Sequence, residues 1–477
     1  MAHRQVVIIH GWSDNSKSFE PLARFLAANA YEPKLVWLGD YISQDDEVRV
    51  EDVAKRMNAV IREMIRRGEL ASSFDVIAHS TGGLVARAWM TSWYRDDPEE
   101  CPMKRLLMLA PANYGSKLAA TGKSVLGRLV KGYNNWFETG QAMLDDLELA
   151  SPYQWELAQR DVLVGPNGDT ANFYGESLVW PFVITGTQPY AGMMRQIVNE
   201  NGSDGTVRVC AANLNARGVT LDFRQTDPQK MRTVWASKLQ AEIPLAVLPT
   251  RTHGSIIDPE RASRDNQEDI EETAEEKHLL GRLILQALEC KSFDEYQVIQ
   301  STWDRITEQT AARRDAPGQA HADFYHQYMQ ANFRATDDQG APVADYMLEF
   351  FSNTDKRHDP ANVYMHAQVI EDIKKNTRDP SLRNLLFDRT DLMEAYYRML
   401  PAGTKPVLYL SISAAAPGRN IAYFSSQKIG AEGEVPLHLE ADATRRWLRR
   451  NSTHFIQIII PRMPADKVFR MVNLSSK

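Results

Sequence analysis

FDVIAHSTGGLVA, residues 74–86, is the stretch that decides how this 477-residue chain folds. An apolar, β-prone run leads into a small-x-Ser-x-Gly turn around Ser80, and a helix-forming segment begins immediately after it. Such a turn is tight, so small residues are needed at Ala78 and Gly82, where strand and helix nearly touch. We interpret the stretch as a nucleophile elbow, which exposes the serine hydroxyl at the carboxyl end of a sheet. The alternative is a chance turn in a loop rich in serine and glycine, and the flanking strand and helix argue against it.

Two backbone amides near Ser80 are candidates for holding a developing oxyanion. Thr81 follows the serine at a helix N-terminus, where unpaired amides and the helix dipole attract negative charge. The dipeptide His10-Gly11 ends the first apolar run of the chain and is followed by Trp12. A loop after an early strand commonly supplies the second amide beside an elbow serine, so we expect Trp12 to donate it. A simple strand-ending turn is the alternative for His10-Gly11.

Strand-like and helix-like runs alternate on both sides of the elbow. The predicted strands are residues 6–9, 34–38, 74–78, 106–109, 181–185 and 246–248. The predicted helices are residues 18–30, 48–67, 82–93 and 275–289, with apolar side chains at helical spacing. Strands separated by helices pair in parallel through right-handed crossovers. We therefore predict a doubly wound, mostly parallel α/β sheet.

A serine in an elbow needs a general base, which follows it in the chain after an acidic residue. Between Ser80 and a polar segment at residues 311–319 there are two histidines, His253 and His278. His253 lies in a loop after the last predicted strand, whereas His278 lies in a charged helix and is expected on the surface. We therefore assign the base to His253.

The acidic residue should lie between the serine and the histidine. Asp204 stands in a turn-rich loop, residues 201–207, immediately before a glycine and after the predicted strand 181–185. Its carboxylate would accept the imidazole N–H and stabilise the imidazolium that forms. An ordinary Asp-Gly turn is the alternative. The competing aspartates are Asp169, Asp222 and Asp227.

Five motifs together resemble the lipase branch of the α/β-hydrolases. They are HGW at 10–12, AHSTGG at 78–83, APANYGS at 110–116, SDGTV at 203–207 and RTHGS at 251–255. The set is similar to bacterial triacylglycerol lipases and, more distantly, to lecithin:cholesterol acyltransferase-like and GPI-inositol-deacylase-like groups. The resemblance covers about residues 5–290, and alanine replaces the usual glycine at position 78. It implies an α/β-hydrolase fold and a Ser80, His253 and Asp204 triad that cleaves carboxylic esters.

Residues 116–178 interrupt the strand–helix alternation and resemble the cap of such enzymes. Their apolar residues would line an acyl pocket or lie on a lipid surface, and ordinary packing of an inserted helix pair is the alternative. The apolar residues of the first part are Val125, Leu126, Leu129, Val130, Tyr133, Trp136 and Phe137. The spacing of residues provides no argument for a calcium site.

After the polar segment 311–319 the sequence changes from alternating strand-like and helix-like runs to mainly strand-like runs. We place a domain boundary at this segment. Residues 1–310 form the expected catalytic domain, and residues 319–477 form a β-rich, sandwich-like domain of unknown role. This second part resembles no family that we can name. His358, Asp359 and His366 are scattered loop residues, which rarely hold a metal, so we expect neither a metal nor a cofactor.

The composition of the chain argues against several classes of partner and of functional motif. The net charge of −7 argues against nucleic acid, which needs clustered Lys and Arg. The three cysteines form no CxxC pair, which argues against a zinc or redox motif. The first apolar run is too short for a signal peptide, and no run has the length of a membrane span. We expect a cytoplasmic protein by default, with signal-independent secretion left open.

The expected activity is hydrolysis of carboxylic esters through an acyl-enzyme, on a lipid-like substrate and with transient contact to a lipid interface. One alternative is a phospholipase or acyltransferase that acts at membranes, including a secreted effector. An alternative of another class is a binding protein on a catalytically silent hydrolase fold. A protein partner of the second domain is left open.

Overall fold

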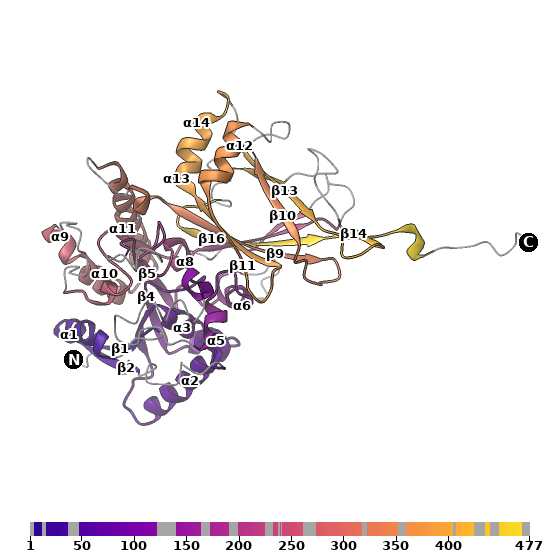
Figure 1. Ribbon diagram of the computed structural model, residues 1–477. Coiled ribbons are helices and arrows are strands. Elements are labelled where there is room, and N and C mark those ends of the chain that lie inside the picture. The colour runs from indigo at the N-terminus through magenta and orange to yellow at the C-terminus, as the bar shows by residue number, and fades with distance from the viewer. Residues whose placement is uncertain are drawn as a thin grey trace, which may run out of the picture. The chain divides into compact units, whose positions relative to one another are not determined.

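The computed structural model describes most of the chain (Figure 1). The described residues are 4–11, 16–36, 47–121, 140–163, 172–189, 199–224, 232–236, 239, 241–260, 273–316, 322–351, 359–403, 407–423, 435–438 and 448–469. Within these ranges the chain divides into two compact units. The first comprises residues 1–216, 236–330 and 450–453, and the second comprises residues 217–235, 331–449 and 454–477.

The first unit is built on a six-stranded sheet in the order β2-β1-β3-β4-β5-β8, in which every neighbouring pair is parallel. The strands are β1 (Arg4–Ile9), β2 (Tyr31–Val36), β3 (Phe74–His79), β4 (Met103–Leu109), β5 (Trp180–Gly186) and β8 (Leu245–Leu248). The central strands are apolar and buried because both of their faces are covered. This sheet confirms the predicted doubly wound, mostly parallel α/β fold, and β3 in its middle ends just before Ser80.

Helices pack on this sheet and connect its strands. They are α1 (Glu20–Ala28), α2 (Val50–Arg66), α3 (Thr81–Trp93), α5 (Gln141–Leu147), α6 (Pro152–Asp161), α8 (Val209–Ala212), α9 (Ala274–Lys277), α10 (Leu279–Glu289) and α11 (Phe293–Ala312). Side chains of α1, α10 and α11 share one apolar core with the sheet, which includes Leu22, Leu283 and Trp303. On another side, Trp89 of α3 donates its indole N–H to Asn58 of α2.

Helix α11 covers the edge strand β8 through two threonines. The Thr307 hydroxyl donates to the Leu245 carbonyl oxygen and accepts from the Val247 amide, and Thr310 donates to the Val247 carbonyl oxygen. An uncovered edge strand would leave such backbone groups free to pair with another chain. The helix therefore closes one side of the first sheet.

The region expected to form a cap is described in part. Helix α6 begins at a Ser151 cap, whose hydroxyl oxygen accepts the Gln154 amide, and α5 precedes it. The apolar residues named above between Val125 and Phe137 lie outside the described residues, so their expected role in lining an acyl pocket remains a prediction.

The second unit is rich in β-structure, as expected. A six-stranded sheet has the order β11-β12-β9-β16-β6-β7, and two smaller sheets pair β10-β13-β15 and β14-β17. The strands are β6 (Ala216–Asp222), β7 (Arg232–Trp235), β9 (Tyr328–Asp337), β10 (Tyr346–Phe351), β11 (Ile370–Lys375), β12 (Leu382–Asp388), β13 (Val407–Ala414), β14 (Ile421–Tyr423), β15 (Val435–His438), β16 (Ser452–Ile460) and β17 (Arg462–Pro464). The helices are the short α12 (Pro360–Tyr364), α13 (Arg389–Asp391) and α14 (Tyr397–Met399).

The two units do not follow one another simply along the chain. Strands β6 and β7 come from a segment that the sequence places inside the catalytic domain, and they extend the sheet of the second unit. The first unit continues to Gln330 and also includes residues 450–453. The polar segment 311–319 thus falls within the first unit. In the described parts of the chain, no helix combines the length and apolar character that a membrane crossing requires.

Candidate active site

Ser80 stands at the sharp turn between β3 and α3. Its φ of +53° and ψ of −125° are strained for a residue with a side chain. The backbone is held in this conformation on both sides, because Ser80 N–H donates to the Leu109 carbonyl oxygen at 3.1 Å and Ala112 N–H donates to the Ser80 carbonyl oxygen at 3.3 Å. The turn has the geometry that an elbow requires, with Thr81 as the first, buried residue of α3.

The loop that follows β1 passes directly against this turn. A Cβ atom placed on Gly11 would lie 2.6 Å from the Ser80 Cβ, and one on Gly82 would lie 2.6 Å from the Ile9 carbonyl oxygen. Such separations are too short for any side chain, so both positions require glycine. The close approach explains the glycine of the HGW motif. Trp12 itself lies outside the described residues, and its role stays a prediction.

The structure brings Ser80, His253 and Asp204 together in one hydrogen-bonded chain. His253 Nε2 lies 3.0 Å from Ser80 Oγ, and His253 Nδ1 lies 2.8 Å from Asp204 Oδ2. Asp204 is fully buried and His253 is nearly so. A carboxylate only accepts hydrogen bonds, so Nδ1 carries the proton and Nε2 is left to accept one from the serine hydroxyl. The arrangement can remove a proton from Ser80 and stabilise the resulting imidazolium.

The second oxygen of Asp204 is bound by its own loop. Asp204 Oδ1 accepts the amides of Thr206 at 3.0 Å and Val207 at 2.8 Å. The Asp204 backbone also contacts the histidine, because His253 N–H donates to the Asp204 carbonyl oxygen at 3.0 Å. These bonds fix the carboxylate with Oδ2 toward the imidazole.

The competing residues lie elsewhere or outside the described residues. Asp222 ends β6 in the second unit and pairs with Arg224 at 2.5 Å. His278 is exposed between α9 and α10. Asp169 and Asp227 fall outside the described residues.

His79 has a contact that the sequence did not reveal. Its Nε2 lies 3.0 Å from the His253 carbonyl oxygen, and the two rings are 4.8 Å apart. Burial, together with the charge that His253 acquires, holds the pKa of His79 well below its usual range. His79 is therefore neutral, and a neutral imidazole with its proton on Nε2 donates to the backbone of His253. Its place next to Ser80 in the elbow was the one available signal.

A buried ion pair joins the described part of the cap region to the elbow helix. Arg87 of α3 donates to both carboxylate oxygens of Asp161 in α6, at 2.7 and 2.9 Å, and both side chains are fully buried. Tyr174 O–H donates to Asp161 at 2.7 Å, and Arg87 also donates to the Asn113 carbonyl oxygen at 3.2 Å. Asn113 belongs to the segment after β4. The pair thus ties three segments around the elbow together.

Residues 1–152 match a family model described as a domain of unknown function, DUF7379. No curated protein has a matching sequence. Among solved structures, phospholipase PlaB from Legionella pneumophila is 25% identical, with a TM-score of 0.78, over 99% of this chain and 97% of that one. The same phospholipase in complex with thio-NAD is 25% identical with a TM-score of 0.76, at the same coverage. The chain therefore has an α/β-hydrolase fold and is similar over nearly its whole length to a phospholipase.

Proposed function

We propose that the chain is a serine hydrolase that cleaves lipid esters through an acyl-enzyme, with Ser80, His253 and Asp204 as its catalytic triad. The observation that carries the proposal is the hydrogen-bonded chain from Ser80 Oγ through His253 to the buried Asp204. Unrelated folds that perform acyl transfer share this constellation. The strained elbow supports the same role, because strain of this kind gathers at functional sites.

The proposed reaction proceeds in two halves. His253 Nε2 takes the Ser80 hydroxyl proton as Oγ bonds to the ester carbonyl carbon, and the carbonyl electron pair moves to its oxygen. The Thr81 amide at the start of α3 stabilises that oxyanion, and the sequence predicts Trp12 as the second donor. When the tetrahedral intermediate collapses, the bond to the alcohol breaks and His253 gives the alcohol its proton. Water then repeats these steps on the acyl-enzyme and releases the acid and Ser80.

A phospholipid is the substrate class that we rank first among lipid esters. The full-length similarity to a phospholipase supports this choice, because it extends through the β-rich unit as well as the hydrolase unit. Triacylglycerols and short soluble esters rank below it. The ranking concerns the substrate alone and leaves the role of Ser80 unchanged.

The test is an acyl-chain and headgroup profile of the full chain and of Ser80→Ala. We expect fatty acid release from phospholipid vesicles to exceed that from triacylglycerol emulsions and from soluble esters. Ser80→Ala should lose roughly 10⁶-fold in kcat, because removing a triad nucleophile costs about as much as removing the whole triad. Preference for short soluble esters would overturn the lipid assignment, and hydrolysis by Ser80→Ala at the wild-type rate would overturn the mechanism. A silent binding protein would hydrolyse none of these substrates.

A further inference from the structure

We propose that Glu200 is a positioning residue for Asp204, acting by closing the loop on which that carboxylate stands. The inference rests on the proposed function, since it assigns a role in the same site. Among the described residues, no hydrogen bond or ion pair joins Glu200 to Ser80 or His253. Its influence must pass through the loop 200–208.

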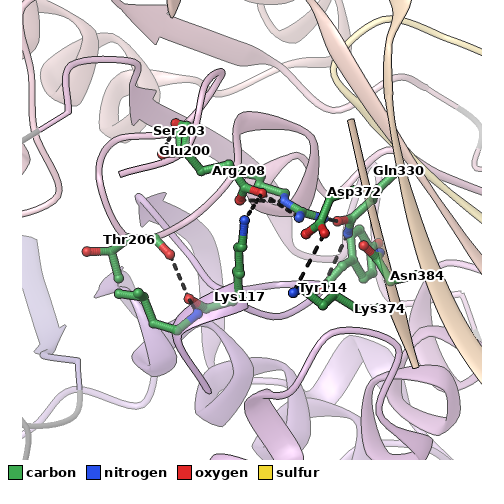
Figure 2. A network of polar contacts seen from close by, with 12 residues as sticks. Tyr114, Lys117, Glu200, Ser203, Thr206, Arg208, Gln330, Asp372, Lys374 and Asn384 are labelled. Atoms are coloured by element: carbon green, nitrogen blue, oxygen red, sulfur yellow. Dashed lines mark hydrogen bonds and ion pairs between the residues drawn. The ribbon is translucent and has the colours of Figure 1, made fainter. Parts of the chain in front are cut away.

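Two cations hold the Glu200 carboxylate (Figure 2). Arg208 donates through Nε to Oε2 and through Nη2 to Oε1, each at 2.6 Å, and Lys117 Nζ donates to Oε1 at 3.2 Å. The paired contacts of Arg208 form a two-pronged fork, which fixes direction as well as distance. Glu200 and Arg208 stand at the two ends of the loop, so their pairing closes it.

Charge and burial show that this pairing is strong. The Arg208 side chain is 1% exposed and that of Glu200 is 11% exposed. Burial would raise the pKa of Glu200, but the charges and hydrogen bonds of Arg208 and Lys117 outweigh it, and the pKa is lowered. The carboxylate is therefore ionised at neutral pH. Neutralising it would remove the charge that the two-pronged contact of the buried Arg208 guanidinium binds, and this would weaken the pairing.

Hydrogen bonds of the loop backbone and of the Ser203 hydroxyl connect the Glu200–Arg208 pair to the part of the loop that carries Asp204. Ser203 O–H donates to the Glu200 carbonyl oxygen at 2.6 Å, and Gly205 N–H donates to Ser203 Oγ at 3.2 Å. Val209 N–H donates to the Gly202 carbonyl oxygen at 2.9 Å beside the ion pair. Asp204 thus lies at the tip of a short, closed loop whose base is the Glu200–Arg208 pair.

One neighbouring segment, which follows β4, forms hydrogen bonds with both the base and the tip of this loop. Ser116 O–H donates to the Thr206 carbonyl oxygen at 2.6 Å. The next residue, Lys117, binds Glu200 (Figure 2). Thr206 in turn donates its amide to Asp204 Oδ1. The segment after β4 therefore fixes the loop at two points, and Glu200 is the acceptor at one of them.

The consequence is a constraint on the 2.8 Å contact between Asp204 Oδ2 and His253 Nδ1. A displacement of about 1 Å in a catalytic group typically lowers a rate by about two orders of magnitude. We expect opening of the loop base to reduce kcat more than it weakens substrate binding, because the loop acts on the contact between Asp204 and His253. A purely structural role would lower stability and leave the rate of each folded molecule unchanged.

The experiment compares the full-length wild type with Glu200→Gln, Glu200→Asp and Glu63→Gln. Glu63 is the matched control, since it too pairs with two cations, Arg66 and Arg67, but on the exposed surface of α2. A fluorophosphonate probe counts the active sites, and kcat and KM for a soluble ester are expressed per labelled site. We expect Glu200→Gln to lose roughly 10- to 100-fold in kcat with KM within about twofold. Glu200→Asp keeps the charge and should recover part of the loss, and Glu63→Gln should match the wild type.

The outcomes separate this inference from the proposed function. A wild-type kcat per labelled site in Glu200→Gln would overturn the positioning role while leaving the triad intact. If Glu200→Gln does not fold, Glu200→Asp decides, and a wild-type kcat in that variant counts against the proposal. If Ser80→Ala is labelled and active to the same extent as the wild type, the proposed function itself fails.

Discussion

At the scale of single residues, the proposed triad depends on contacts with side chains that are not themselves part of it. His79 ends β3, one residue before Ser80, and its imidazole donates to the His253 carbonyl oxygen at 3.0 Å. One short segment therefore carries Ser80, the proposed nucleophile, and also supports the backbone of His253, the proposed base. Asp204 binds the same histidine through its backbone carbonyl oxygen and its carboxylate.

Replacing His79 by leucine should impair catalysis more than it impairs folding. The His253 carbonyl oxygen would lose a buried donor, which costs about 1–3 kcal/mol, and the imidazole of His253 would lose its support. We expect kcat to fall roughly tenfold or more for a soluble ester, and kcat together with denaturant unfolding measures both effects. His79→Gln, which keeps an N–H donor, is the control and should recover part of the loss. An unchanged kcat in His79→Leu would show that the contact is dispensable.

Part of the site could be predicted from the sequence because its chemistry has an order along the chain. Ser80, Asp204 and His253 follow from the elbow motif and the sequence of serine, acid and base, and the structure brings these residues into contact. The roles of His79 and Glu200 could not be predicted in this way. Each depends on which backbone carbonyl or cation the folded chain places nearby, and neither shows in a motif or a spacing.

At the scale of elements, the ion pair between α3 and α6 joins the elbow helix to the cap region. Burial opposes the charge of Arg87, but the Asp161 carboxylate, bound through two hydrogen bonds, outweighs it and raises the pKa of Arg87. The Arg87 guanidinium therefore stays charged at neutral pH. The pair stabilises the fold only while both side chains are present, because a buried charge without its counter-charge is costly.

Replacing Arg87 by methionine should destabilise the first unit by about 3–5 kcal/mol, because Asp161 would remain as a buried, unpaired charge. The double variant Arg87→Met with Asp161→Leu should recover much of this loss. Denaturant unfolding of the wild type, both single variants and the double variant measures the coupling. A double variant as unstable as the sum of the two single variants would contradict the pairing.

The elements of the first sheet were predictable because their signals are local. The expected strand at 74–78 is β3 (Phe74–His79), and the expected helix at 82–93 is α3 (Thr81–Trp93). Strands β6 and β7 had no such signal for their destination. The neighbour of β6 in the sheet, β16, lies more than two hundred residues further along the chain, and β7 joins the sheet through β6. No local periodicity encodes a pairing over such a distance.

At the scale of the whole molecule, each of the two units contains a short segment that is separated along the chain from the rest of that unit. Strands β6 and β7 extend the sheet of the second unit, whereas residues 450–453 belong to the first unit. Within the first unit, the Thr453 hydroxyl donates to the Cys210 carbonyl oxygen at 2.9 Å, and Asn213 donates to the Asn451 carbonyl oxygen at 2.5 Å. The first unit is thus completed by residues from near the end of the chain.

A chain ending at Gln330 should fold poorly for this reason. It would lose residues 450–453, and β6 would lose β16, its neighbour in the sheet. We expect low soluble yield and little fluorophosphonate labelling, because the edge of β6 that faces β16 would be open to pairing with another chain. Soluble yield and labelled fraction, measured beside the full chain, test this. A truncated chain that is soluble and labelled like the full chain would show that the first unit is self-sufficient.

The central claim is that Ser80 is the nucleophile of an acyl-transfer site. The most direct measurement is mass-spectrometric mapping of the residue modified by a fluorophosphonate probe in the full chain. We expect a single adduct on Ser80 in the wild type, and much slower labelling in His253→Ala, because His253 takes the serine proton. Modification of another residue, or labelling of His253→Ala at the wild-type rate, would contradict it.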